Sequence, residues 1–214
     1  MRKALQQGSN ARAERARVQR DRILDAAQRC FSERGFHGAS MAMIADTAQM
    51  SPGLIYRYFA GKSELIHGIV SRQVELLADD LEALESGTRD PVDGIVENYE
   101  YCVTRNREDA STPCHLDATL VLEIVAESSR DPVIAEALDL LDQRISHGLG
   151  QWLAQAAGQR GTQVAPELLQ ARTLILRALL DGLKMRQARD PELDLAMLRR
   201  GLQDVLPQLL GDAA

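Results

Sequence analysis

Four side chains between residues 56 and 62 have the chemistry to bind a polyanion. Arg57 and Lys62 carry positive charge, and the hydroxyls of Tyr56 and Tyr58 can donate hydrogen bonds to phosphate oxygens. The guanidinium fork of Arg57 also fits the O6 and N7 atoms of guanine, which makes Arg57 the best candidate for reading a base. The alternative is structural, with both tyrosines in a core and Lys62 a solvated lysine. At a helix start, however, that lysine would oppose the helix dipole unless a phosphate lay nearby.

The segment that positions these side chains, SMAMIADTAQMSPGLIYRYF, predicts two short helices joined by a tight turn. Ser40 is typical of an N-cap for a helix over 41–48. Ser51 followed by Pro52 marks the start of a second helix, which we expect to run to about Phe59. Two such helices crossing through a short turn form a helix-turn-helix. Gly53 near the second start would let that helix approach DNA closely.

The rest of the chain predicts an all-α protein. A helical period begins near Arg17 and stops at Gly35, after a polar and basic stretch, 1–15, that we expect to be a flexible arm. Further helices are expected over 62–84, 92–107, 116–129, 132–157, 166–188 and 192–206, giving eight or nine in all. Scarce aromatics, at 4%, and recurrent Ala and Leu favour helices over sheets.

The charge distribution separates a basic end from an acidic body. The net charge is −6, which alone argues against nucleic acid. Residues 1–62, however, carry 11 Lys and Arg against 5 Asp and Glu, a net charge of +6. Residues 63–214 carry 14 against 26, a net charge of −12. This asymmetry predicts a basic working end over 1–62 on an acidic helical body over 63–214.

Other classes of site have little support in the sequence. We find no G-x-S-x-G, H-E-x-x-H, Walker or dinucleotide-binding pattern, so we predict no enzyme and no catalytic residues. Three cysteines without close spacing indicate neither a disulfide framework nor a zinc site, and we predict no metal and no cofactor. No apolar run is long enough for a membrane span, and no secretory signal is recognisable. We therefore expect a cytoplasmic protein without a membrane partner.

The N-terminal quarter of the chain resembles the DNA-binding region of the TetR family of repressors. The resemblance covers about residues 17–70 with continuous spacing. Its matching elements are Ile23-x-x-Ala26-Ala27-x-x-x-Phe31, Arg34-Gly35-Phe36, Ser40, Ile44-Ala45-x-x-Ala48, Ser51, Gly53-x-x-Tyr56-x-Tyr58-Phe59 and Lys62-x-x-Leu65.

The resemblance implies a role for individual positions. Ser40 would cap its helix and reach a phosphate, and Tyr56 and Lys62 would contact phosphates or a thymine methyl. The recognition helix would carry Ser51, Gly53, Leu54, Arg57 and Tyr58. The sequence departs from the family at Gln49, where many members have Gly. A left-handed Gln49 would cost about 1 kcal/mol, so the turn could differ slightly.

A homodimer interface is predicted on the last two helices. Leu195, Leu198, Leu202 and Val205 follow one another at steps of three and four residues, a narrow seam suited to helix packing. The helix over 166–188 adds Ile175, Leu179 and Gly182, the last of which lets another helix come close. Pairing with the symmetry mates would form a four-helix interface, as the resemblance implies. The alternative is that both faces are satisfied within one chain.

A small-molecule effector is expected between the helices over 92–107, 116–129, 132–157 and 166–188, where the resemblance implies a pocket. Tyr99, Cys102 and Glu123 are the predicted contacts, although all three could be structural residues. A buried Glu123 would need a partner, either an Arg of the protein or a ligand. The acidic body argues against a polyanion, and the few aromatics argue against an aromatic cage for a quaternary cation. We therefore expect a mostly apolar, neutral or weakly cationic effector.

Together with the resemblance, these observations predict a DNA-binding transcriptional regulator, with a DNA-binding domain over 1–62 and a helical domain for regulation and dimerisation over 63–214. The first hypothesis is a repressor that a small-molecule effector releases from a palindromic, double-stranded operator. The second is a DNA-binding regulator without a small-molecule ligand, controlled by a protein partner or by abundance. The third, a helical enzyme or carrier with an accidental helix-turn-helix, has the least support.

Overall fold

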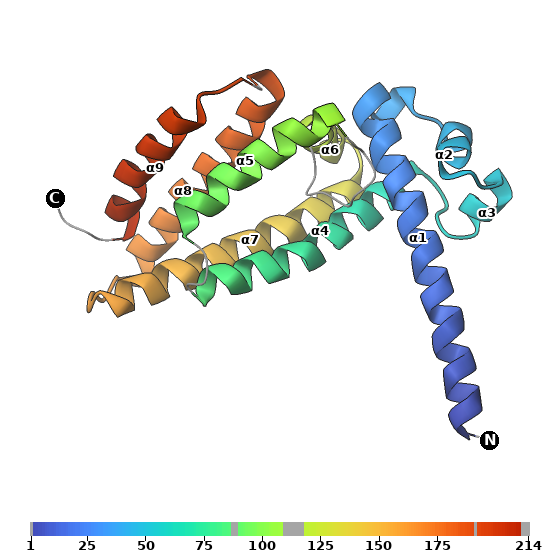
Figure 1. Cartoon of the computed structure of the whole chain (residues 1–214), viewed down its shortest axis with the longest axis horizontal. Helices are drawn as coiled ribbons and strands as arrows, with labels where there is room; N and C mark the ends of the chain where they lie inside the picture. Colours follow the sequence, from blue (N-terminus) through green and yellow to red (C-terminus); the bar gives the residue numbers. More distant parts are fainter. Residues whose placement is uncertain (1, 87–89, 109–117, 191, 211–214) are drawn as a thin grey trace. The chain divides into compact units, whose positions relative to one another are not determined.

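The computed structural model describes residues 2–86, 90–108, 118–190 and 192–210, without the side chains of 2–11, 78, 79, 81, 85, 102 and 104–108. Within these ranges all regular structure is helical (Figure 1). The helices are α1 (Arg2–Gly38), α2 (Met41–Ala48), α3 (Pro52–Tyr56), α4 (Lys62–Glu85), α5 (Pro91–Glu108), α6 (Ala118–Ser128), α7 (Pro132–Gln159), α8 (Pro166–Arg189) and α9 (Leu195–Leu210). The prediction of an all-α protein is therefore confirmed. None of the described helices is long and apolar enough to cross a bilayer.

The chain divides into two compact units. Unit 1 comprises Met1–Ile69 and Glu123–Ala135, and unit 2 comprises Val70–Leu122 and Glu136–Ala214. Unit 1 thus holds α1, α2, α3, the start of α4, the end of α6 and the first residues of α7. The division differs from a boundary at residue 62 because the α6–α7 segment joins the N-terminal helices. The assignment of functions to 1–62 and 63–214 stays a prediction.

The core of unit 1 contains the apolar residues that the helical period singled out. Ile23, Phe31, Ile44 and Ile55 are each fully buried. In α4, Gly68 lies close to α1, where an added Cβ would come within 2.9 Å of Leu24 Cδ2. α2 packs against α1, and α3 packs against α2 (Figure 1).

The predicted flexible arm is helical in the structure. α1 begins at Arg2 and runs 37 residues to Gly38, with a break at Gly35, where φ is 70° and ψ is 168°. The helical start is consistent with a stretch rich in Ala, Arg, Gln and Glu, all good helix formers. Gly35 marks the predicted stop, but one more helical turn follows it.

Aspartate caps begin α5, α7 and α9, whereas α8 has no side-chain cap. The Asp90 carboxylate accepts the Val92 N–H at 2.8 Å, and the Asp131 carboxylate accepts the Val133 N–H at 2.9 Å. Both aspartates precede a proline at the first helical position, an arrangement that suits a helix start. In α9 the Asp194 carboxylate takes the same role, accepting the Ala196 N–H at 2.8 Å, so the helix begins later than residue 192.

The last helix continues past a proline because its apolar face is buried. α9 runs to Leu210 with Pro207 inside it, whereas the sequence predicts an end near residue 206. Leu206 and Leu210 are 2% and 6% exposed in the core of unit 2. The apolar residues of that core come from α5, α7, α8 and α9 and include Val96, Trp152, Leu153, Leu176 and Leu202. Burial of this face offsets the hydrogen bond that the proline cannot make.

Candidate nucleic-acid interface

Ser40 and Ser51 cap the two helices of the predicted helix-turn-helix. Ser40 Oγ accepts the Met43 N–H at 3.2 Å, and Ser51 Oγ accepts the Leu54 N–H at 3.3 Å. Both serines are exposed at the surface of unit 1. Because each hydroxyl acts as an acceptor in its cap, its own proton stays available to donate to another group, such as a phosphate oxygen.

Gln49 makes the turn between α2 and α3 in the left-handed conformation. Its φ and ψ are 54° and 46°, and it is the one non-glycine residue with positive φ among the described residues. The side chain is held from α1, because Arg22 Nη2 donates to Gln49 Oε1 at 3.0 Å. Glycine would fit this conformation without strain, but only the Gln49 side chain can link the turn to α1.

The second helix presents an open surface. α3 is short and ends at Tyr56, so Arg57 is its C-cap and Tyr58 follows it, slightly earlier than the predicted end near Phe59. Ile55 is buried and Leu54 half-buried, which anchors the helix. The Tyr56 side chain is 55% exposed, so it is no core residue.

Two further features of this surface favour a close approach. A Cβ added at Gly53 would meet nothing within 4 Å, so no packing inside the chain explains this glycine. The Arg57 guanidinium lies 5.7 Å from the centre of the half-buried Tyr58 ring, a distance at which the ring attracts the cation. Arg57 is itself exposed and can reach outward from that support.

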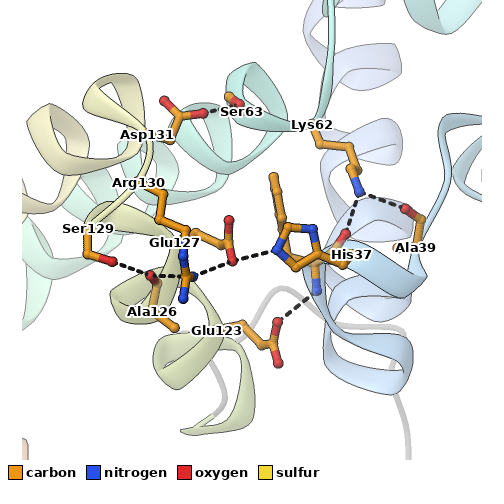
Figure 2. Close-up of polar contacts among 11 residues, drawn as sticks. His37, Ala39, Lys62, Ser63, Glu123, Ala126, Glu127, Ser129, Arg130 and Asp131 are labelled. Carbon is orange, nitrogen blue, oxygen red and sulfur yellow. Dashed lines mark hydrogen bonds and ion pairs between the residues drawn. The ribbon is translucent and has the colours of Figure 1, made fainter.

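Lys62 has partners within unit 1 that the sequence did not indicate. Its Nζ atom donates to the carbonyl oxygens of Phe36 at 2.5 Å and of Ala39 at 3.1 Å (Figure 2). The same atom lies 4.5 Å from the centre of the Phe36 ring. These carbonyls are at the end of α1, where the helix leaves them without intrahelical partners. Lys62 thus caps α1 from the start of α4. The predicted phosphate contact of Lys62 stays a prediction.

Two carboxylates of α6 bind the same end of α1 (Figure 2). Glu123 Oε2 accepts the Phe36 N–H at 2.8 Å. Glu127 is 6% exposed, and its Oε1 atom lies 2.9 Å from His37 Nε2 and 3.2 Å from Arg130 Nη1. The structure therefore gives Glu123 a partner inside the protein, a backbone amide rather than the expected arginine. An additional role for Glu123 in effector binding stays a prediction.

The break in α1 makes room for this contact. A Cβ at Gly35 would lie 3.2 Å from both carboxylate oxygens of Glu123, and the φ of 70° is one that other residues rarely adopt. Close by in the same unit, Ser63 Oγ donates to the Asp131 carboxylate, and this bond lowers the pKa of Asp131.

The predicted effector contacts in unit 2 are held by internal bonds where they are described. Tyr99 is 3% exposed, and its hydroxyl donates to the Asp190 carbonyl at 3.0 Å. Burial, followed by the charge of Asp190, raises the pKa of Tyr99. The Gln187 Nε2 atom donates to the Tyr99 carbonyl at 3.2 Å. The side chain of Cys102 lies outside the described residues.

A groove along α7 and α8 has a volume of about 720 Å³ and is open to solvent. Asp142, His147, Thr173, Leu174 and Arg177 are among its lining residues. None of the three predicted effector contacts lines it. Among the described side chains, no three of His, Cys, Asp and Glu gather closely enough to hold a metal ion.

The predicted dimer residues face two different directions. Leu202 is 3% exposed in the core of unit 2, and Leu179, Leu195 and Leu198 pack against that core. Ile175 and Val205, in contrast, are 56% and 42% exposed. Most of the predicted seam on α9 thus serves the chain's own core, because α5 packs against it.

The outward faces of α8 and α9 carry other apolar and small residues. Leu174 is exposed on α8, and the apolar and small residues of one exposed stripe there are Leu168, Ala171, Ile175, Ala178, Gly182 and Met185. On α9 they are Met197, Gly201 and Val205. A Cβ at Gly182 or Gly201 would meet nothing within 4 Å. Sequence analysis missed Gly201, whose four-residue steps to Met197 and Val205 were the available signal.

Comparison with known proteins identifies the family. Residues 23–69 match the model of bacterial regulatory proteins of the tetR family, and residues 109–211 match the C-terminal model of BetI-type transcriptional repressors. The transcriptional regulator UidR of Escherichia coli K12 is 33% identical over 166 residues, 78% of each chain. The repressor AcnR of Corynebacterium glutamicum is 27% identical over 79% of this chain and 81% of its own.

A solved structure supports the same assignment. Salmonella enterica GusR is 30% identical and aligns over 89% of this chain and 96% of its own, with a TM-score of 0.59. UidR and GusR are similar to this chain over most of their length, and the family model covers α2, α3 and the helices that support them. The chain therefore belongs to the tetR family of bacterial regulatory proteins and is a helix-turn-helix transcriptional regulator.

Proposed function

We propose that the chain is a homodimeric repressor that binds a palindromic operator through α2 and α3 and releases it when a small effector binds in unit 2. The observation that carries the DNA-binding part is the surface of α3. Gly53, Tyr56 and Arg57 are exposed there, and no packing inside the chain explains Gly53. The repressor assignment is supported by the BetI-type C-terminal match and by the name of AcnR.

An operator selected from random duplexes by the full chain tests DNA binding. Arg57→Ala is expected to cost about 1–3 kcal/mol on that operator and to relax specificity at one base pair of each half-site, as for loss of a bidentate contact. Arg144→Ala, which removes an exposed arginine of α7, is the matched control and should bind like wild type. Unchanged specificity in Arg57→Ala would show that another residue reads the base.

The dimer is supported by two glycines on the outward faces of α8 and α9, Gly182 and Gly201, where an added Cβ would meet nothing within 4 Å. Glycine inside a helix costs about 0.5–1 kcal/mol relative to alanine, so Gly182 and Gly201 are unfavourable for an isolated chain. Both lie on exposed apolar faces, where a second copy of the chain could pack its helices closely. A two-fold dimer would also present two half-site readers, as a palindromic operator requires.

Alanine at both positions separates the two interpretations of the glycines. In a monomer, Gly182→Ala with Gly201→Ala should raise stability, whereas at an interface the added methyl groups should weaken self-association. Sedimentation over a range of micromolar concentrations measures the difference, with the unfolding midpoint measured in parallel. Wild type sedimenting as a monomer throughout would contradict the dimer.

The effector part is supported by an unpaired polar atom. Gln187 is 8% exposed, and its Oε1 atom has no hydrogen-bond partner among the described residues. The bond from Nε2 to the Tyr99 carbonyl fixes the orientation of the amide, because the flipped form would place two oxygens together. An unsatisfied buried acceptor costs about 1–3 kcal/mol, which a hydroxyl or N–H donor of a ligand would offset.

The predicted effector, mostly apolar and neutral or weakly cationic, fits this acceptor if it carries one hydrogen-bond donor. Three helices, α4, α6 and α7, run from one unit into the other, so the backbone itself connects an effector in unit 2 to the DNA-binding unit. Release requires that the effector bind the two states of the protein with different affinities. A regulator without such a ligand, controlled by a partner or by abundance, is the alternative.

Operator release by a panel of small neutral and monocationic compounds tests the effector. Gln187→Met removes the unpaired acceptor and should fold normally, bind the operator and lose release by any compound that donates to it. Glu123→Gln keeps an oxygen to accept the Phe36 N–H, so folding should persist, and altered release would indicate an effector role. Normal release in both variants would contradict the assigned contacts.

A further inference from the structure

The positive charge of the N-terminal region lies mostly outside its helix-turn-helix. Residues 40–62 carry two cations, Arg57 and Lys62, against Asp46, a net charge of +1. The Lys62 ammonium already binds two carbonyl oxygens. Residues 2–22 carry seven Lys and Arg against two Asp and Glu, a net charge of +5. The electrostatic attraction that non-specific DNA binding needs must therefore come largely from the first half of α1.

Within that half of α1, three arginines share one face. Arg12, Arg15 and Arg22 follow one another at helical steps of three and seven residues, with Gln19 between the last two. Arg22 binds Gln49 in the turn before α3, which places this face on the side of the helix-turn-helix. Arg12 and Arg15 are exposed and make no hydrogen bond or ion pair with any described residue.

The other arginines of this stretch have different surroundings. The Arg20 guanidinium lies 4.8 Å from the centre of the Phe59 ring. Arg17, on the opposite side of the helix, binds Glu14 at 3.0 Å. Among the arginines of this stretch whose side chains are described, those without partners are thus Arg12 and Arg15, which continue the face of Arg22 toward the N-terminus.

We propose that Arg12 and Arg15 form a second DNA contact, binding backbone phosphates that flank each half-site. This inference rests on the proposed DNA-binding function and adds a contact outside the helix-turn-helix. At 1.5 Å per residue, α1 carries Arg12 about 15 Å beyond Arg22, or roughly half a turn of duplex. Phosphates at that distance are a sequence-independent ligand, so the contact strengthens binding without reading bases.

Two duplexes test the proposal, each bound by the full chain. One ends at the outer edges of the two half-sites recovered by selection, and the other adds ten base pairs of mixed sequence on each side. Arg12→Gln with Arg15→Gln removes four phosphate contacts per dimer. On the long duplex, the slope of log affinity against log salt should fall by about 3.6 in magnitude. The advantage of wild type should accordingly shrink about 150-fold between 50 and 200 mM salt.

Control variants distinguish a local phosphate contact from a general effect of the positive charge of α1 on DNA binding. Arg17→Gln removes the same charge from the opposite face and should leave the slope nearly unchanged, whereas Arg12→Gln and Arg15→Gln should each lower it by about 1.8. On the short duplex the double variant should match wild type. Circular dichroism checks that all variants keep the helical content of wild type.

Three outcomes are decisive. An equal loss in Arg17→Gln would show a general electrostatic effect and overturn the proposal. An equal loss on the short duplex would place the contact inside the half-sites and overturn the flanking assignment. If wild type binds no selected duplex, the DNA-binding function itself fails, and that result is distinct from binding in which Arg12 and Arg15 make no difference.

Discussion

The sequence predicts the exposed residues of the helix-turn-helix better than those of the last helix, α9. At the end of α3, the predicted DNA contacts Tyr56 and Arg57 are exposed, whereas Leu54 and Tyr58 are half-buried. In α9, the regular apolar seam is mostly buried in the chain's own core, and the outward face carries Met197, Gly201 and Val205. The helices of the helix-turn-helix are positioned by caps between residues three positions apart. The burial of α9 depends instead on which distant helix packs against each of its faces. Spacing shows that a stripe is apolar but cannot show what lies against it.

The largest effect should distinguish the two faces of α9. Leu202→Ala removes a side chain that is 3% exposed and should lower the free energy of unfolding by about 2–5 kcal/mol. Val205→Ala, three residues away and 42% exposed, should change it by less than about 0.5 kcal/mol at concentrations where the chain is monomeric. Chemical denaturation of both variants measures the contrast. Equal costs would show that the inward and outward faces are wrongly assigned.

Lys62 distinguishes an internal cap from a DNA contact. Lys62→Met keeps most of the side-chain length but removes two charge-assisted hydrogen bonds, so stability should fall by about 1.5–3 kcal/mol. If the ammonium acts only inside unit 1, the salt slope of operator binding should stay that of wild type. A slope smaller by about 1.8 per dimer, with unchanged stability, would instead support the phosphate contact.

Gly35 tests the break in α1 that receives Glu123. Gly35→Ala should cost about 1–3 kcal/mol, because alanine disfavours a φ of 70° and its Cβ would crowd the carboxylate. Gly38→Ala is the control, since its Cβ would make an ordinary 3.5 Å contact with Arg34. Thermal unfolding of the two proteins provides the comparison. A neutral Gly35→Ala would mean that this backbone conformation is not required.

The smallest effect is expected at the turn itself. Gln49→Gly relieves a left-handed conformation worth about 1 kcal/mol but loses the hydrogen bond from Arg22. The two changes nearly cancel, so stability should shift by less than about 0.5 kcal/mol. Arg22→Gln in the Gln49→Gly background should then have no further effect on stability. A substantial additional loss would show that Arg22 has another partner.

Much of unit 1 could be predicted from the sequence alone because its signals are local. Ser40, Ser51 and Pro52 mark helix starts within one turn. The same spacing carried the family resemblance, which comparison with known proteins confirmed. Each of these features depends on residues within three or four positions of one another, so neighbouring residue types are enough to predict them.

Only the tertiary structure decided which groups meet across long separations. The Phe36 amide binds Glu123 across 87 positions, and Lys62 binds Phe36 across 26. Leu202 is buried because α5, far away in the sequence, packs against α9. The sequence pattern around a residue does not reveal such a distant partner. A carboxylate or a leucine occurs at the same spacing whether protein, ligand or solvent lies against it. The sequence determined where the helices begin and what they carry, and packing determined which of those residues remain free to bind.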